Sequence, residues 1–316
     1  MAIAPDAVRW AYRLFLDREP ESEAVVESYR ETSDIPALRN IFLNSDEYRA
    51  RNGDRGQVGR FTDIPTIPVE VEASEADIRA MMDRIAKEWR RFGETEPHWS
   101  VLTSEMFTAD KIEENINLFY ESGRGDLKFI FNPLTRSGIP ATRFGKVLDF
   151  GCGVGRLSLV LAAYADQVVG VDISPPHLKL ARERAAQTGV TNVDFKAING
   201  PADFDGLTGF DLVVCLIVLQ HNPPPVMATL LDKLLRTLAP GGVAVIQMPT
   251  FLRDYRFSVA DYLANTQPSM EMNALPQSAI FAIADQAGCR VLEVREDHCL
   301  GTLPGISQTF AFMRTR

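Results

Sequence analysis

Three glycines at alternate positions follow a short apolar run and an acidic residue within residues 147–156. The stretch reads Val-Leu-Asp-Phe-Gly-Cys-Gly-Val-Gly-Arg, so that Asp149 precedes Gly151, Gly153 and Gly155. Glycine lacks a Cβ atom, so it adopts positive φ angles and admits close contact with a ligand. A dinucleotide-binding turn reads G-x-G-x-x-G, and its last glycine would stand where this chain has Arg156. The sequence therefore predicts a strand that leads into a ligand-binding turn of another kind.

A second acidic residue, Asp172, ends the apolar run 168–171 and stands 21 positions after Gly151. An acidic side chain at the carboxyl end of a second strand can accept hydrogen bonds from both hydroxyls of a ribose. The alternative is that Asp172 and Ser174 cap a helix that begins at Pro175. We expect the ribose role, because the strand end and the spacing from the glycine turn coincide.

The G-x-G-x-G turn with its preceding acidic residue resembles the first motif of the class I S-adenosylmethionine (SAM) dependent methyltransferases. The resemblance implies SAM as cofactor and S-adenosylhomocysteine as product. It also implies that Asp149 and the backbone of Gly151 lie near the methionine ammonium end, and that Ile173 packs on the adenine. The predicted cofactor-binding residues are Asp149, Gly151, Cys152, Gly153, Gly155, Arg156, Asp172, Ile173, Asn199 and Leu216.

Asn199 follows the third predicted strand, where the resembled family often carries an acidic residue that reads the adenine amino group. Its amide oxygen or the carboxylate of Asp203 could accept that hydrogen bond, and a plain turn is the alternative. His221 follows the fourth predicted strand. Its ordinary pKa suits removal of a proton from a hydroxyl near neutral pH, so His221 is the predicted catalytic base; an orienting or packing role is the alternative.

The acceptor side is expected in residues 98–120, in Gln220 and Asn222, and in the long connection 249–275. Long connections between regular elements are usually functional or disordered. The predicted substrate contacts are Trp99, Tyr120, Gln220, Asn222, Arg253 and Tyr255. Surface exposure is the alternative for Arg253. We expect no obligatory metal, because Asp, Glu and His do not cluster at the strand ends.

Apolar runs alternate with helical stretches from about residue 145, which predicts an α/β fold with a doubly wound, mostly parallel, seven-stranded sheet. The predicted strands are 146–150, 167–171, 193–196, 211–217, 242–248, 289–296 and 307–314. Helices are expected from about 156, 175, 225 and 276. Only a loop separates the last two strands, so they should pair antiparallel.

Four regions are predicted: a small helical module over 1–52, a linker over 53–72, a helical lid or acceptor-side extension over 73–144, and a SAM-binding domain over 145–316. In the first region Ala7, Trp10, Ala11, Leu14 and Phe15 recur at helix spacing. Its pattern around 12–20 and 42–48 resembles a small helical module of bacterial proteins of glycan and cell-surface metabolism. A docking or homo-oligomerisation arm is the alternative.

The composition is that of a globular protein, with 46% hydrophobic and 24% charged residues in a chain of 316. A net charge of -9 argues against a nucleic-acid partner. No secretory signal and no run of about 18 apolar residues is visible, so we expect no membrane span and a cytoplasmic location. The four cysteines form no C-x-x-C pair and are expected to be reduced and buried.

These observations predict a SAM-dependent methyltransferase, most simply an O-methyltransferase that acts on a glycan, a sugar or another small hydroxylated metabolite. The alternatives are a natural-product N- or O-methyltransferase and a SAM-binding interaction protein without catalytic activity. A dinucleotide oxidoreductase is a third hypothesis, which NAD binding without SAM binding would favour.

Overall fold

The computed structural model of the chain describes residues 3–52, 68–140, 143–265, 270–301 and 303–315. The chain divides into two compact units, Met1–Thr66 and Ile67–Arg316. The predicted linker 53–72 lies outside the described residues as far as residue 67.

The described part of the first unit consists of helices α1 (Pro5–Leu16), α2 (Glu23–Ser28), α3 (Ile35–Leu43) and α4 (Asp46–Asn52). Asp34 begins α3 by accepting a hydrogen bond from the backbone N–H of Ala37 at 2.7 Å. The core of the unit consists of Ile3, Val8, Ala11, Tyr12, Leu16, Val26, Leu38 and Phe42. Trp10 and Leu14 recur at helix spacing as the pattern indicated, but their side chains are 55% and 73% exposed. The inward face of α1 is centred on Val8 and Tyr12 instead.

The second unit is built on a seven-stranded sheet of order β3-β2-β1-β4-β5-β7-β6. Its strands are β1 (Phe144–Phe150), β2 (Ala165–Asp172), β3 (Val193–Ala197), β4 (Phe210–Cys215), β5 (Leu238–Leu252), β6 (Cys289–Asp297) and β7 (Gly305–Arg314). Strands β1 to β5 pair in parallel, whereas β7 pairs antiparallel with both β5 and β6. The predicted fold class, including the antiparallel last pair, is confirmed.

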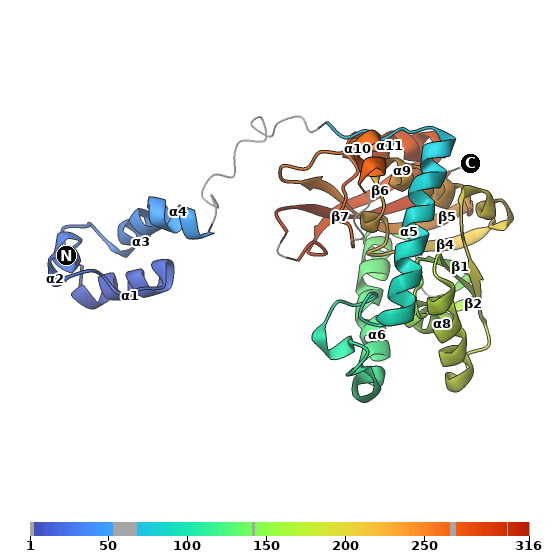
Figure 1. Cartoon of the computed structure of the whole chain (residues 1–316), viewed down its shortest axis with the longest axis horizontal. Helices are drawn as coiled ribbons and strands as arrows, with labels where there is room; N and C mark the ends of the chain where they lie inside the picture. Colours follow the sequence, from blue (N-terminus) through green and yellow to red (C-terminus); the bar gives the residue numbers. More distant parts are fainter. Residues whose placement is uncertain (1–2, 53–67, 141–142, 266–269, 302, 316) are drawn as a thin grey trace. The chain divides into compact units, whose positions relative to one another are not determined.

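Helices cover both faces of this sheet (Figure 1). They are α5 (Glu75–Thr95), α6 (Ile112–Arg136), α7 (Arg156–Leu161), α8 (Pro175–Thr188), α9 (Pro224–Arg236), α10 (Val259–Ala264) and α11 (Gln277–Gln286), with short 3-10 helices η2 (Glu105–Phe107), η3 (Ala162–Tyr164), η4 (Pro201–Gly206) and η5 (Leu219–His221). Adjacent strand residues point to opposite faces, so Leu148 packs in the core with α5, α9 and α11 while Val147 packs with α6 and α7. Because both faces are buried, the strands are almost continuously apolar.

Two details differ from the sequence expectation. The helical extension expected over 73–144 is interrupted between α5 and α6, because Pro97 has no N–H to donate and disfavours a helical Glu96. Strand β4 ends at Cys215 rather than at Ile217, because Ile217 takes a φ of 60°.

Among the described residues no helix has the length and apolar character that crossing a bilayer requires. The four cysteines are free thiols, and all but the half-buried Cys299 are buried.

Candidate active site

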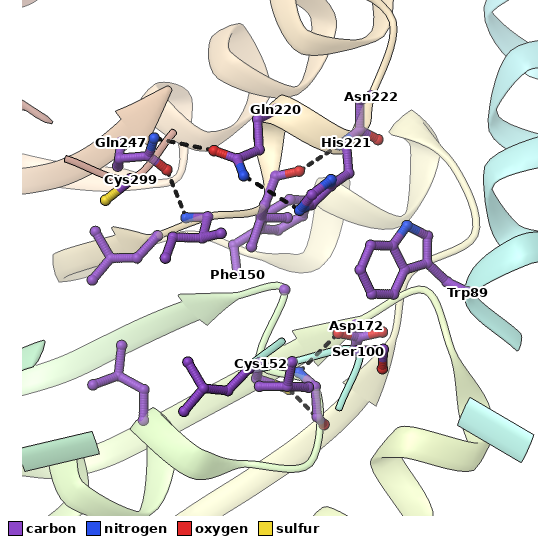
Figure 2. Close-up of a pocket in the computed structure, with 18 of the residues that line it drawn as sticks. Trp89, Ser100, Phe150, Cys152, Asp172, Gln220, His221, Asn222, Gln247 and Cys299 are labelled. Carbon is purple, nitrogen blue, oxygen red and sulfur yellow. Dashed lines mark hydrogen bonds between the residues drawn. The ribbon is translucent and has the colours of Figure 1, made fainter. Parts of the chain in front are cut away.

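A cavity of about 390 Å³ opens beyond the carboxyl ends of β1, β2 and β4. The sheet order reverses between β1 and β4, and open α/β sheets bind ligands at this kind of switch point. Figure 2 shows Cys152 and Asp172 on one side of the cavity, Gln220, His221 and Asn222 on the other, and Trp89 of α5 beside them.

The glycine turn forms one wall, and its glycines are required by packing as well as by conformation. Gly151 and Gly153 have φ angles of +72° and +52°. A Cβ atom on Gly151 would lie 2.3 Å from Val218 Cγ2, and one on Gly153 would lie 2.6 Å from Val101 Cγ2. Gly155, with a φ of +80°, faces away from the cavity toward α8 and β3. Any larger residue at position 151 or 153 would therefore overlap the neighbouring Val218 or Val101 side chain.

Asp172 ends β2 and fixes the turn. Its Oδ2 accepts a hydrogen bond from the N–H of Gly153 and its Oδ1 from the N–H of Ser174, each at 2.8 Å. The side chain of Ser174 does not cap α8 but lies 2.7 Å from His177 Nδ1. His177 Nε2 in turn lies 2.9 Å from Ser100 Oγ, which donates to the carbonyl of Pro97. This chain of contacts joins the connection between α5 and α6 to the end of β2.

Asp149 and Arg156 place opposite charges below the turn. Asp149 is 3% exposed, and its Oδ2 accepts a hydrogen bond from Ser158 Oγ at 2.5 Å. Burial raises the pKa of Asp149 to about 6, although the Ser158 hydrogen bond and the nearby Arg156 oppose that shift. Arg156 donates to Asp126 at 2.6 Å and to Ser122 at 3.1 Å, while its buried Nε has no hydrogen-bond partner among the described residues.

The opposite wall rests on a buried amide network. Gln247 of β5 accepts a hydrogen bond from the N–H of Ile217 at 2.8 Å, which stabilises the positive φ angle of that β-branched residue. The Gln247 amide group donates to Ser307 of β7 at 2.6 Å and to Gln220 at 3.2 Å. The amide of Asn222 donates to the carbonyl oxygen of Val218 at 2.9 Å. Strands β5 and β7 thus hold the η5 turn in place.

His221 stands in η5 with a defined ring orientation. Its Nδ1 lies 2.8 Å from the backbone carbonyl oxygen of Glu271, and a carbonyl only accepts, so Nδ1 carries the proton of the neutral ring. Nε2 is then the basic nitrogen, 3.5 Å from the amide nitrogen of Gln220. Burial lowers the pKa of His221, which keeps the ring neutral at neutral pH.

Most of the residues predicted from the sequence lie together around this cavity. They are Asp149, Gly151, Cys152, Gly153, Arg156, Asp172, Ile173, Leu216, Gln220, His221 and Asn222. Six others are not among the lining residues: Gly155, Asn199, Trp99, Tyr120, Arg253 and Tyr255. Tyr120 donates to the carbonyl of Val154, and Tyr255 donates to the side chain of Asn273. Ile198 rather than Asn199 lines the wall, and Arg253 is exposed.

Several lining residues were missed by the sequence reasoning. They include Phe129, His177, Gln247, Cys299 and Thr309, whereas Met270 and Met272 lie in the connection 249–275 that was expected on the acceptor side. The apolar stripe of α5 did contain a signal, since Met82, Ile85 and Trp89 lie on it and all three line the cavity. Within the described ranges no group of three or more His, Cys, Asp or Glu side chains is arranged to hold a metal ion.

Comparison with known proteins matches residues 147–242 to a family described as a methyltransferase domain. The ubiquinone biosynthesis O-methyltransferase of Burkholderia vietnamiensis is 35% identical over 127 residues, which are 39% of this chain and 53% of that protein. Its counterpart from Idiomarina loihiensis is 41% identical over 102 residues, 31% of this chain and 40% of that protein. The chain therefore matches about half the length, or less, of these relatives.

A solved structure shares the fold. It is the magnesium protoporphyrin IX methyltransferase of Synechocystis PCC 6803 with bound S-adenosylhomocysteine, at a TM-score of 0.50 and 18% identity, over 73% of this chain and 98% of that one. The strand order is that of the class I SAM-dependent methyltransferase fold, and residues 147–242 match a methyltransferase domain. The cofactor of this class is SAM, as the glycine turn predicted. The resemblance of residues 1–52 to a glycan-related module stays a prediction.

Proposed function

We propose that the chain transfers a methyl group from SAM to a hydroxyl oxygen of a small, uncharged acceptor. The observation that carries this proposal is the position of His221 across one cavity from Asp172 and the glycine turn (Figure 2). The relatives named as O-methyltransferases support oxygen as the methylated atom.

The charges around the cavity fit the cofactor. Its described lining contains three carboxylates, Asp126, Asp149 and Asp172, and one guanidinium, Arg156. SAM carries an ammonium, a sulfonium and a carboxylate, so a wall with excess negative charge suits it. Asp149 would lie near the ammonium, Arg156 Nε would donate to the carboxylate, and the Asp172 oxygens would accept from the ribose hydroxyls. When bound, SAM supplies an electrophilic methyl group.

The residues of the chain would prepare the acceptor. His221 Nε2 would accept the hydroxyl proton, because Nδ1 already donates to Glu271. The apolar side chains of Met82, Ile85 and Trp89 would cover the reaction site and exclude water. Positioning and exclusion of water are the main sources of rate in such a reaction.

The same lining favours an uncharged acceptor. Arg156 is the one lysine or arginine among the described lining residues, and it is paired with Asp126. The carboxylates of the cavity would therefore repel an anionic acceptor, and the described lining has no unpaired cation to neutralise its charge. A sugar or glycan hydroxyl satisfies these conditions as one class, and a natural product with an apolar body and a hydroxyl satisfies them as another.

The test is to incubate the chain with SAM and fractionated small metabolites and to follow S-adenosylhomocysteine. We expect product with neutral hydroxylated fractions and none with phosphorylated ones. SAM binding without transfer to any fraction would favour the interaction protein, and binding of NAD in place of SAM would refute the proposal.

A further inference from the structure

One arginine outside the cavity connects helix α5 to the residues around Glu271. Nη1 of Arg84 donates to the backbone carbonyl oxygens of Tyr262 and Asn265, at 2.8 Å and 2.5 Å. Its Nη2 pairs with Glu271 Oε1 at 3.0 Å, and its guanidinium lies 4.3 Å from the centre of the Tyr262 ring. A single guanidinium thus contacts the end of α10 and the described residues after position 269.

The residue that Arg84 holds is the residue that orients His221. The Glu271 side chain pairs with Arg84, and its backbone carbonyl accepts from His221 Nδ1 at 2.8 Å. Its two chain neighbours, Met270 and Met272, line the cavity. Any movement of Glu271 would therefore change both the hydrogen bond to His221 and the apolar wall.

We propose that the Arg84–Glu271 ion pair is a positioning device that holds the Glu271 carbonyl against His221 Nδ1 and so keeps Nε2 unprotonated and facing the acceptor. The inference rests on the proposed function, in which His221 is the base. Arg84 and Glu271 are absent from the cavity lining, so they act through other residues. Their side chains are 20% and 18% exposed, so solvent screens the pair less than an exposed one.

The surroundings of His221 set the direction of the expected change. The Glu271 carbonyl contacts His221 directly, the charged groups Arg84 and Glu88 of α5 lie near the Glu271 side chain, and Trp89 contacts the rings of both His221 and His177. Burial lowers the pKa of His221, and the hydrogen bond to the Glu271 carbonyl opposes this to a smaller extent. Loss of the ion pair should admit water to the ring, so the pKa of His221 should rise toward its ordinary value.

The first test observes the histidine ring directly. The chain has four histidines, so a ¹⁵N-histidine spectrum of the full chain contains the signals of only four rings. The signal that disappears in His221→Gln is the signal of His221. In the unsubstituted chain we expect one tautomer with the proton on Nδ1. In Arg84→Met we expect a mixture of tautomers and a titration midpoint raised by about 0.5 unit or more. Glu271→Gln loses the charge but keeps a side-chain oxygen that can accept from Arg84 Nη2, so it should move the same signal less.

Two further variants separate positioning from general damage. Arg79→Met changes an exposed arginine on the same helix and should leave the His221 signal unchanged. Arg84→Lys retains the charge facing Glu271 and should restore most of the single-tautomer signal. An Arg84→Met spectrum identical to that of the unsubstituted chain would overturn the inference, whatever the activity.

Kinetics with an active acceptor give the second readout. In Arg84→Met we expect kcat/KM for the acceptor to fall about tenfold and the acidic limb of the pH profile to move upward, while SAM affinity stays within about twofold. An equal loss at every pH would indicate a structural role only and would overturn the inference. Undiminished activity of His221→Gln would instead refute His221 as the base, and with it the proposed function.

Discussion

The close approach of Val101 to the glycine turn gives a prediction whose size follows from the structure. We consider Gly153→Ala. The φ of Gly153 is +52°, and an alanine there costs about 1–2 kcal/mol from backbone strain. Its Cβ would lie 2.6 Å from Val101 Cγ2, an overlap that costs about 1–3 kcal/mol because valine is stiff at χ1. The sum predicts a loss of about 2–5 kcal/mol in the free energy of unfolding.

A rescue variant separates the two costs. After Val101→Ala, the nearest remaining atom to the new Cβ is the residue 101 Cβ at 3.8 Å, an ordinary contact. The double variant should therefore recover about 1–3 kcal/mol relative to the sum of the single changes. Gly189→Ala is the control, because its φ is +70° and nothing lies within 4 Å of its added Cβ. It should lose only about 1–2 kcal/mol.

Urea unfolding followed by tryptophan fluorescence measures these values. Trp89 and Trp99 lie in the 67–316 unit, and Trp10 lies in the first unit, so a Trp10→Phe background isolates the second unit. Trp10 is 55% exposed, which makes that background change mild. Equal losses for Gly153→Ala and the Gly189 control, or additivity of the double variant, would refute the overlap and leave strain alone.

Three further results are expected. Asp172→Asn should weaken SAM binding about 10–100-fold in calorimetry, because hydrogen bonds to a charged acceptor are worth about 1.5–3 kcal/mol. The control is Asp166→Asn, which changes an exposed residue on the same strand, and equal effects of the two changes would contradict the ribose role of Asp172. SAM affinity should fall as the pH drops through about 6, because the Asp149 carboxyl is then protonated and neutral opposite the ammonium; a flat profile from pH 5 to 8 would contradict that contact. His221→Gln should lower kcat for a hydroxyl acceptor about 10²–10⁴-fold and leave SAM affinity unchanged. In the unsubstituted chain, the acidic limb of the kcat–pH profile should lie below the ordinary histidine pKa of about 6.5, because burial lowers the pKa of His221. An acidic limb above that value would contradict a buried neutral base.

The sheet could be predicted from the sequence because its strands are buried on both faces. Runs such as 168–171 are apolar throughout, and glycine and proline mark their ends. The structure lengthened most strands by one to four residues at their ends without moving any of them. The antiparallel pairing of the last two strands could be predicted from the short loop between them, because a parallel pair needs a long crossover connection.

The proposed cofactor side of the cavity was predictable because its residues stand directly at strand ends. Asp149, Gly151 and Asp172 each follow or end an apolar run, and parallel strand ends meet at one sheet edge. The acceptor side was not predictable in the same way. Met82, Phe129 and Thr309 come from two helices and the last strand, so only the completed fold brings them together. The apolar stripe of α5 contains Met82, but such a stripe also fits an ordinary core face, and no local pattern marks Phe129 or Thr309.

The position of β7 in the sheet affects the order in which the chain can fold during its synthesis on the ribosome. Strands β1 to β4, with the glycine turn and Asp172, precede residue 216 and can pair as soon as they emerge. Strand β5 offers an unpaired edge until β7 is synthesised, because β7 lies between β5 and β6. Ser307 of β7 also supports Gln247. A nascent chain would thus form the proposed SAM-binding half of the cavity first. The proposed acceptor half, next to an aggregation-prone strand edge, would form only once the last strand is synthesised.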